Sequence, residues 1–264
     1  MHLARAFAGI TMREWLRFLR QHGRLAAAII RPLIWLAVFS AGFRSALGLS
    51  ITPPYETYIL YEVYLAPGLA GMMLLFHGMQ TSLSMVYDRE MGSMRVLLTS
   101  PLPRWYLLGA RLIATTLVVT PLVLAFLLIA RLWGVTPPWA GYAAALPAIV
   151  LSGLMLGAFG LLISSMVKQL ENFAGVMNFV IFPMFFTSTA LYPLWRLEDA
   201  SIWIARLAAI NPFTYAVELI RFALYLQIAP LALAVVLGSL AAFLALSVLG
   251  YQPERAWSIR RADA

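Results

Sequence analysis

Residues 112–130 read LIATTLVVTPLVLAFLLIA, a stretch without a single charged side chain. An α-helix needs about 20 apolar residues to cross the hydrocarbon core of a bilayer, so this stretch and its flanks predict a transmembrane helix over residues 106–132. Further apolar stretches of similar length predict five more spans. They cover residues 25–47, 58–87, 142–167, about 173–192, and 230–251.

The composition of the whole chain agrees with a membrane protein. Of its 264 residues, 62% are hydrophobic and only 11% are charged, and the mean hydropathy is +0.84. Soluble domains are about a quarter charged, so a soluble enzyme, a disordered chain and a coiled coil are all disfavoured. We therefore predict an all-α integral membrane protein with one transmembrane domain over residues 1–264, in which residues 25–251 form the six-span bundle.

Residue counts also argue against catalysis by the chain itself. There is no cysteine, and the one lysine, Lys168, lies outside any G-x-x-x-x-G-K-[ST] loop, so a P-loop ATPase is excluded. The three histidines have no metal-ligand spacing, and the three aspartates leave no intramembrane pair. We predict no catalytic residue, no metal site and no cofactor bound by this chain.

Charge predicts the orientation. The net charge is +8, and 14 of the 19 basic residues fall in the amino terminus, the loop at 88–105, the loop at 168–172 and the tail at 252–264, with Arg31 and Arg111 just inside the adjoining spans. Basic residues are enriched in cytoplasmic loops, so both termini are predicted to be cytoplasmic. In a membrane protein this excess indicates contact with anionic lipid rather than with nucleic acid.

Residues 1–24 have an amphipathic helical pattern. Arg13, Arg17, Arg20 and Arg24 share one face, while the opposite face is aromatic and apolar. This pattern predicts an interfacial helix with its arginines near lipid phosphates, although a soluble amphipathic helix packed on a partner would look the same.

The stretch at 88–104 contains alternating charges, then a short helical pattern, and ends at Pro101 and Pro103. Met91, Met94, Leu97 and Leu98 share a face and could anchor this helix in another protein's groove. An interfacial helix that caps the preceding span explains the pattern equally well.

The segment at 195–226 is too charged for a plain span and too apolar for a free loop. We expect one or two short re-entrant or interfacial helices on the outer side, since irregular backbone at membrane depth needs protein or a wet cavity around it. Glu218 and Arg221 lie three residues apart, which favours a structural ion pair over an outer gate.

Within the spans, His77 and Gln80 share a face and could line a substrate path, or simply hydrogen-bond between helices. Methionines and aromatics, including Phe185 and Phe186, would suit an adaptable apolar cavity or ordinary core packing. The small residues Gly153, Gly157 and Gly160 predict close helix contact, more often within the subunit than at a dimer interface.

Two motifs carry a resemblance to a known family. Residues 88–103, DREMGSMRVLLTSPLP, resemble the R-E-x-G-T-x-x-x-L-L-x-[ST]-P segment of the ABC-2 type permeases, and residues 211–221, NPFTYAVELIR, resemble a second motif of the same family. Ser93 replaces the usual threonine, and Arg111 replaces a frequent lysine. The form of the first motif is most similar to drug-resistance and nodulation-type exporters.

The resemblance implies the membrane subunit of an ATP-driven exporter in the bacterial cytoplasmic (inner) membrane. It implies a homodimer of permeases with two copies of a separate ATPase subunit, which binds ATP and Mg²⁺. The positions that it assigns to ATPase coupling are Asp88, Arg89, Glu90, Met91, Gly92, Ser93, Met94, Leu97, Leu98, Arg13 and Arg17. Those that it places at the outer gate or re-entrant segment are Asn211, Pro212, Tyr215, Glu218 and Arg221.

The substrate remains open at this point. A small hydrophobic or amphiphilic compound is favoured, and a polysaccharide or glycolipid is the alternative within the family. An ATP-independent channel, a secondary transporter and a membrane anchor for assembly are the competing functions.

Overall fold

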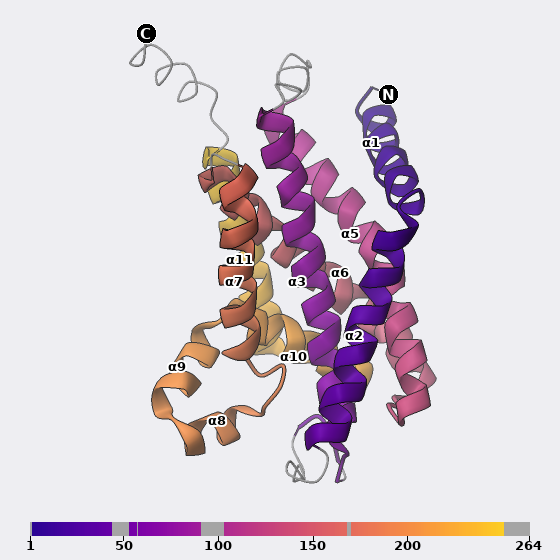
Figure 1. Cartoon of the computed structure of the whole chain (residues 1–264), viewed down its shortest axis with the longest axis vertical. Helices are drawn as coiled ribbons and strands as arrows, with labels where there is room; N and C mark the ends of the chain where they lie inside the picture. Colours follow the sequence, from indigo (N-terminus) through magenta and orange to yellow (C-terminus); the bar gives the residue numbers. More distant parts are fainter. Residues whose placement is uncertain (1, 44–52, 57, 91–102, 168–169, 251–264) are drawn as a thin grey trace.

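The computed structural model describes residues 2–43, 53–56, 58–90, 103–167 and 170–250, and its regular elements are helices (Figure 1). The helices expected to cross the membrane are α2 (His22–Phe43), α3 (Tyr61–Glu90), α5 (Arg104–Ile129), α6 (Trp139–Met166), α7 (Leu170–Phe186) and α11 (Pro230–Gly250). The others are α1 (His2–Leu19), the 3₁₀ turn η1 (Ala130–Trp133), α8 (Leu194–Ala200), α9 (Ile202–Ile210) and α10 (Pro212–Leu224).

The long helices run alternately up and down one bundle. The start of α1, the end of α3 and the end of α11 lie at the same end of the molecule, whereas α8 and α9 lie at the other (Figure 1). This arrangement matches the predicted grouping of the basic segments on one side. Following the charge bias, we refer to the end that carries α1 as the cytoplasmic end.

The helix lengths establish a multi-pass membrane protein. Four helices are long and apolar enough to cross a bilayer, namely those within Tyr61–Tyr87, Trp105–Trp133, Trp139–Met166 and Pro230–Gly250. The bent pair of α9 and α10 meets the same criterion as one unit, while α2 and α7 contain shorter apolar stretches, Ala26–Gly42 and Gly175–Phe186. The all-helical membrane class is confirmed, and the count of six spans stays a prediction.

Helix α6 forms the centre of the bundle, in contact with α3, α5, α10 and α11. Its small residues allow this, because a Cβ on Gly157 would collide with Leu112, and the Cβ of a residue at Gly78 on α3 would press on the Gly157 backbone. Packing of the glycine face within the subunit is therefore confirmed.

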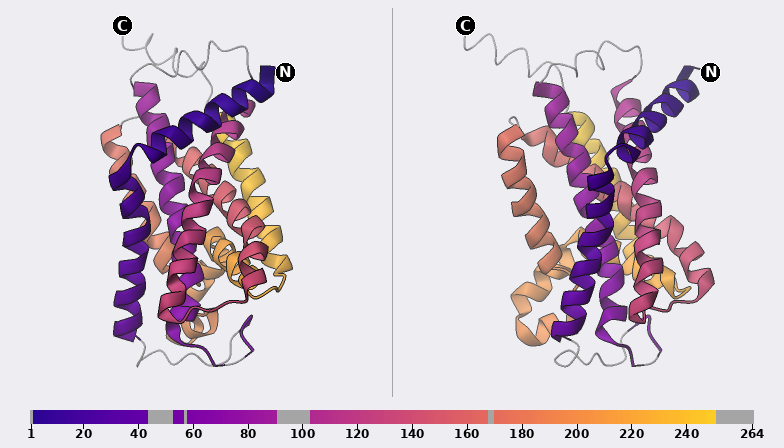
Figure 2. Two further views of the ribbon diagram at one scale, coloured as in Figure 1. Left: turned by 90° about the vertical axis from the view of Figure 1, so that its right-hand side faces the viewer. Right: turned by 45° about the vertical axis from the view of Figure 1, so that its right-hand side comes forward.

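The amino-terminal helix crosses obliquely over the cytoplasmic end of the bundle (Figure 2). The hydroxyl of Tyr106 on α5 donates to the carbonyl of Leu3 at 2.6 Å, which fixes the start of α1. The helix ends at Leu19 and α2 begins at His22, so the predicted helix over residues 1–24 is divided by a break at Arg20 and Gln21. The interfacial location stays a prediction.

Between α7 and α11 the structure differs from the expectation. The segment contains three helices rather than one or two, and α9 and α10 meet at 74°. Helix α7 ends at Phe186, six residues before the predicted interruption, and Pro193 then starts α8. The physical reason is local: Asn211 and Pro212 end α9 and begin α10, because proline is well suited to the first turn of a helix but not to its interior.

Candidate functional site

A groove lies between the helix pair α1–α2 and the helix pair α3–α5. It consists of two adjoining pockets, each partly open to the surface, which share Ala28, His77 and Gln80 as lining residues. One pocket has an apolar wall formed by Met72, Met73 and Phe76 of α3, and the other has a polar wall formed by residues of α1, α3 and α5.

The predicted pair His77 and Gln80 is at the centre of this groove. Both belong to α3, and because they are three residues apart their side chains share one face of the helix. The ring of Phe18 on α1 meets His77 edge-on, with centroids 6.2 Å apart. Both residues therefore line the groove, and their role in a substrate path stays a prediction.

Helix α2 adds a positive charge that the sequence analysis used only for orientation. Arg31 is exposed, lines the groove, and places its guanidinium 5.3 Å from the centre of the Phe76 ring. Arg31 is the sixth residue of the apolar stretch Ala26–Gly42, and charges within such stretches are costly and generally mark a path or a partner. The sequence feature that could have identified this residue is Arg31 itself, a charged side chain inside the apolar stretch 25–47.

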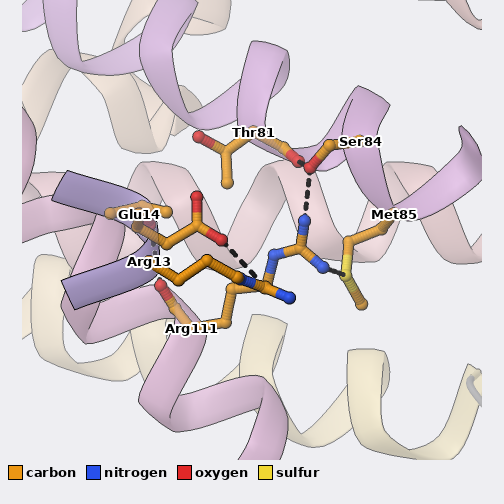
Figure 3. A network of polar contacts seen from close by, with 7 residues as sticks. Arg13, Glu14, Thr81, Ser84, Met85 and Arg111 are labelled. Carbon is orange, nitrogen blue, oxygen red and sulfur yellow. Dashed lines mark hydrogen bonds and ion pairs between the residues drawn. The ribbon is translucent and has the colours of Figure 1, made fainter. Parts of the chain in front are cut away.

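Helix α1 supplies the acidic and basic groups at the other pocket. Arg17 lines this pocket, as does Glu14, whose side chain is 10% exposed and forms an ion pair with Arg13 at 3.0 Å (Figure 3). The sequence analysis did not single out Glu14. The predicted role of Arg13 and Arg17 in ATPase coupling stays a prediction.

A buried arginine joins α3 to α5 beside the groove. Arg111 is 4% exposed, and it donates to the hydroxyl of Ser84 and to the sulfur of Met85 (Figure 3). Ser84 in turn donates to the carbonyl of Thr81 at 2.6 Å. Since α3 and α5 flank residues 91–102, Arg111 fixes the two helices on either side of the predicted coupling segment.

The remaining predicted residues fall elsewhere. Asp88, Arg89 and Glu90 form the last turn of α3, and Met91, Gly92, Ser93, Met94, Leu97 and Leu98 lie outside the described residues, as does the tail at 252–264. Phe185 and Phe186 do not line the groove. Phe185 is buried against Phe213, with ring centroids 6.2 Å apart, while Phe186 is 44% exposed.

The residues predicted at the outer segment build the α9–α10 corner, defined by the turn at 187–190 with Asn211, Thr214, Tyr215 and Arg221. Asn211 donates to the carbonyls of Met184 and Thr187 at 2.7 and 2.9 Å, and it accepts from the backbone N–H of Phe213 at 3.0 Å. One side chain therefore caps the end of α7 and the start of α10.

Two hydroxyl groups complete this corner. Thr214 donates to the carbonyl of Ala208, and Tyr215 donates to the carbonyl of Ala209, each at 2.7 Å. Both acceptors belong to α9, so the bend between α9 and α10 is held by side chains of α10. Pro212 occupies the first turn of α10, as its ring geometry favours.

Arg221 reaches from α10 to α3. It is 3% exposed, its guanidinium lies 3.9 Å from the centre of the Tyr64 ring, and it donates to the carbonyl of Thr189 at 2.8 Å. Tyr64 donates to the same carbonyl at 2.8 Å. This arrangement ties the turn at 187–190 to α3.

The predicted ion pair of Glu218 and Arg221 is wrong. Within the described part of the chain these two residues form no ion pair at 4.0 Å or less. The buried guanidinium is instead stabilised by a carbonyl and an aromatic face, which requires no second charge to be removed from water.

Two tyrosines lie beside this region, outside the long helices. Tyr55 meets Tyr225 edge-on at 4.8 Å, and its hydroxyl donates to the carbonyl of Val63 at 3.2 Å. Burial raises the pKa of Tyr225 to about 12, and burial also raises that of Tyr55 above its ordinary value. Both phenols therefore remain neutral at physiological pH.

Comparisons with known proteins agree with this arrangement. The family described as ABC-2 type transporter matches residues 5–225. The transport permease ycf38 of Porphyra purpurea is 27% identical over 220 residues, covering 81% of this chain and 72% of the relative.

Two bacterial relatives are also similar. The multidrug ABC transporter permease YbhR of Escherichia coli K12 is 31% identical over 173 residues, which cover 63% of this chain and 45% of the relative. Nodulation protein J of Rhizobium leguminosarum bv. viciae is 30% identical over 83 residues, or 31% of each chain. Since the family match extends over most of the chain, this protein belongs to the ABC-2 type transporter family as a membrane permease.

Proposed function

We propose that the chain is the permease subunit of an ATP-driven exporter that moves a small hydrophobic or amphiphilic compound out across the bacterial inner membrane. The observation that carries this proposal is the groove. Sites for small ligands combine an apolar wall with a few convergent polar groups, and the groove at His77 and Gln80 combines these two features. Similarity to YbhR, which is described as a multidrug permease, supports the same substrate class.

The energy would come from a separate ATPase subunit, since the chain has no phosphate-binding loop. Two copies of the permease would assemble with two ATPases. Closure of the ATPases would push on the segment at 88–100, and α3 and α5, joined by Arg111, would transmit the movement to the groove.

In this proposal the α9–α10 corner is a rigid support on the outer side. Opening of the outer side would therefore move the whole corner as one unit. The carbonyls of Met184, Thr187, Thr189 and Ala208 accept hydrogen bonds from Asn211, Thr214 and Arg221, and the N–H of Phe213 donates to Asn211. Breaking these contacts inside a membrane is costly, which favours rigid-body movement over local unfolding.

The direct test is purification of the chain from its own membranes in mild detergent, with ATP hydrolysis measured on the eluate. We expect a stoichiometric partner that hydrolyses ATP and that is lost when Glu90→Ala is combined with Leu97→Asp. The matched control is Glu198→Ala with Leu226→Asp, which makes the same changes at the opposite end of the bundle and should retain the partner.

A chain that purifies without a nucleotide-binding partner, yet transports in response to an ion gradient, would contradict the proposal and favour a secondary transporter. Transport of a long polysaccharide in place of small compounds would contradict the proposed substrate class while leaving the ATPase partnership intact.

A further inference from the structure

The groove carries excess positive charge. Arg17 and Arg31 both line it, and the acidic residue that lines it, Glu14, is already paired with Arg13 at 3.0 Å. Within the described residues that line the groove, Glu14 is the one carboxylate, so neither of the two lining arginines is neutralised there.

These polar groups meet at a similar depth. Arg31 follows the start of the apolar stretch Ala26–Gly42 by five residues, and Gln80 precedes the end of the span Tyr61–Tyr87 by seven. At 1.5 Å per residue these offsets are about 8 and 10 Å. Both distances are measured from the cytoplasmic end (Figure 1). A cation, an imidazole and an amide therefore converge at a similar level, about one to two helical turns inside the apolar parts of α2 and α3.

The apolar wall adjoins these groups directly. Phe76 stacks against the guanidinium of Arg31, and Met72 and Met73 lie one turn away on the same helix and line the same pocket. Methionine and aromatic side chains adapt to hydrocarbon of varied shape. The groove thus has a cationic part and a hydrocarbon part side by side.

We propose that this groove binds an anionic amphiphile, a molecule with a phosphate or carboxylate head and an alkyl chain. Arg31 of α2 forms charge-assisted hydrogen bonds with the head, and Arg17 of α1 contacts the head from the other side. Gln80 completes the polar contacts. The chain of the ligand lies on Met72, Met73 and Phe76. Where this ligand is cargo, the inference rests on the proposed function and specifies its substrate class.

The charge selects among ligands. A cationic amphiphile would meet two uncompensated guanidinium groups, and a neutral one would leave Arg31 unpaired at depth, where an unpaired charge is unfavourable. A small inorganic anion would pair with the arginines but would leave the methionine wall empty.

The test is equilibrium binding to the purified full-length chain in a neutral detergent. The probe is a fluorescent hexadecyl phosphate, compared with the hexadecyl alcohol and the hexadecyl trimethylammonium that carry the same fluorophore. We expect the phosphate to bind at least tenfold more tightly than either. Arg31→Gln and Arg17→Gln should each weaken phosphate binding about tenfold, or about 1.4 kcal/mol, and leave alcohol binding unchanged.

The matched control is Arg206→Gln. Arg206 is also exposed and lies 5.3 Å from the centre of the Trp203 ring, the same distance as Arg31 from Phe76, but it belongs to α9 at the other end. This variant should bind the phosphate as the parent does. Arg31→Lys keeps the charge but loses the planar fork of the guanidinium, so it should bind the phosphate more tightly than Arg31→Gln and less tightly than the parent. This intermediate result separates loss of the charge contact from loss of folding.

Equal binding of all three probes, or an equal loss with Arg206→Gln, would overturn the inference. Because the assay needs no ATPase, its failure is distinct from failure of the proposed function. Proteoliposomes that contain the chain and its ATPase then identify the source of the ligand: ATP moves the labelled phosphate across the bilayer if it is cargo, whereas a resident membrane lipid stays bound.

Discussion

The groove and the α9–α10 corner both place polar side chains inside an apolar bundle, but they use them in different ways. In the corner, Asn211 satisfies three backbone groups and Arg221 is stabilised by a carbonyl and a ring. In the groove, Arg17 and Arg31 line open space. Polar groups with internal partners stabilise the fold, whereas groups that face a cavity are available to a ligand. Substitutions in the corner should therefore mainly lower stability, and substitutions in the groove should mainly change transport.

The largest effect on stability is expected from Gly68→Ala, at the contact between α3 and the corner. A Cβ at this position would overlap the backbone of Ala190, which cannot move away without shifting the turn at 187–190. Overpacking of this kind costs about 3 kcal/mol or more. The measurement is the thermal midpoint of the purified protein in detergent.

Gly109→Ala is the control, because a Cβ there meets nothing within 4 Å. It should be neutral or stabilise the helix by about 0.5–1 kcal/mol. Equal thermal midpoints for the two variants would show that the corner is not tightly packed against α3.

The next largest effect is expected from Asn211→Ala. It leaves the carbonyls of Met184 and Thr187 and the N–H of Phe213 without their partner, and we expect a combined cost of about 1–3 kcal/mol. Asn211→Asp keeps an acceptor for Phe213 and should recover part of the loss. Asn178→Ala, at an exposed position on α7, should change the thermal midpoint little. If Asn178→Ala lowers the midpoint as much as Asn211→Ala does, the capping of both α7 and α10 by Asn211 is not what stabilises the corner.

A smaller effect is expected from Ser84→Ala, which removes the hydroxyl that accepts from Arg111. We expect a loss of about 1–2 kcal/mol in stability, and a larger relative loss of transport than of ATP hydrolysis, because α3 and α5 would no longer move together. Ser165→Ala serves as control, since Ser165 donates to a carbonyl of its own helix. If transport and hydrolysis fall in proportion, Arg111 has a purely structural role.

The smallest effect on stability is expected from Gln80→Leu in the groove. Its amide faces the cavity, so the thermal midpoint should change by the equivalent of less than about 0.5 kcal/mol. Transport of substrates with a polar head should fall, while transport of purely apolar compounds should persist. Proteoliposome uptake of one substrate of each class provides the measurement, and an unchanged ratio would exclude Gln80 from the path.

Much of the architecture could be predicted from the sequence. The predicted span at 142–167 corresponds to α6 (Trp139–Met166) within three residues, because hydrophobicity and helix-ending residues are local properties of the chain. The shared face of His77 and Gln80 followed from helical periodicity alone. The end of α7 was missed, since the residue that caps it, Asn211, comes 25 positions after Phe186.

The sequence by itself determined the membrane class and, through two motifs, the family. Its basic residues also predicted which end of the bundle faces the cytoplasm. Only the tertiary structure decided which polar groups meet: that Arg31 of α2 joins His77 and Gln80 of α3, that Arg111 bridges α3 and α5, and that Arg221 binds Thr189 rather than Glu218. The physical reason is that helix formation depends on neighbours within a few residues. The pairing of side chains from different helices depends instead on how the whole bundle packs.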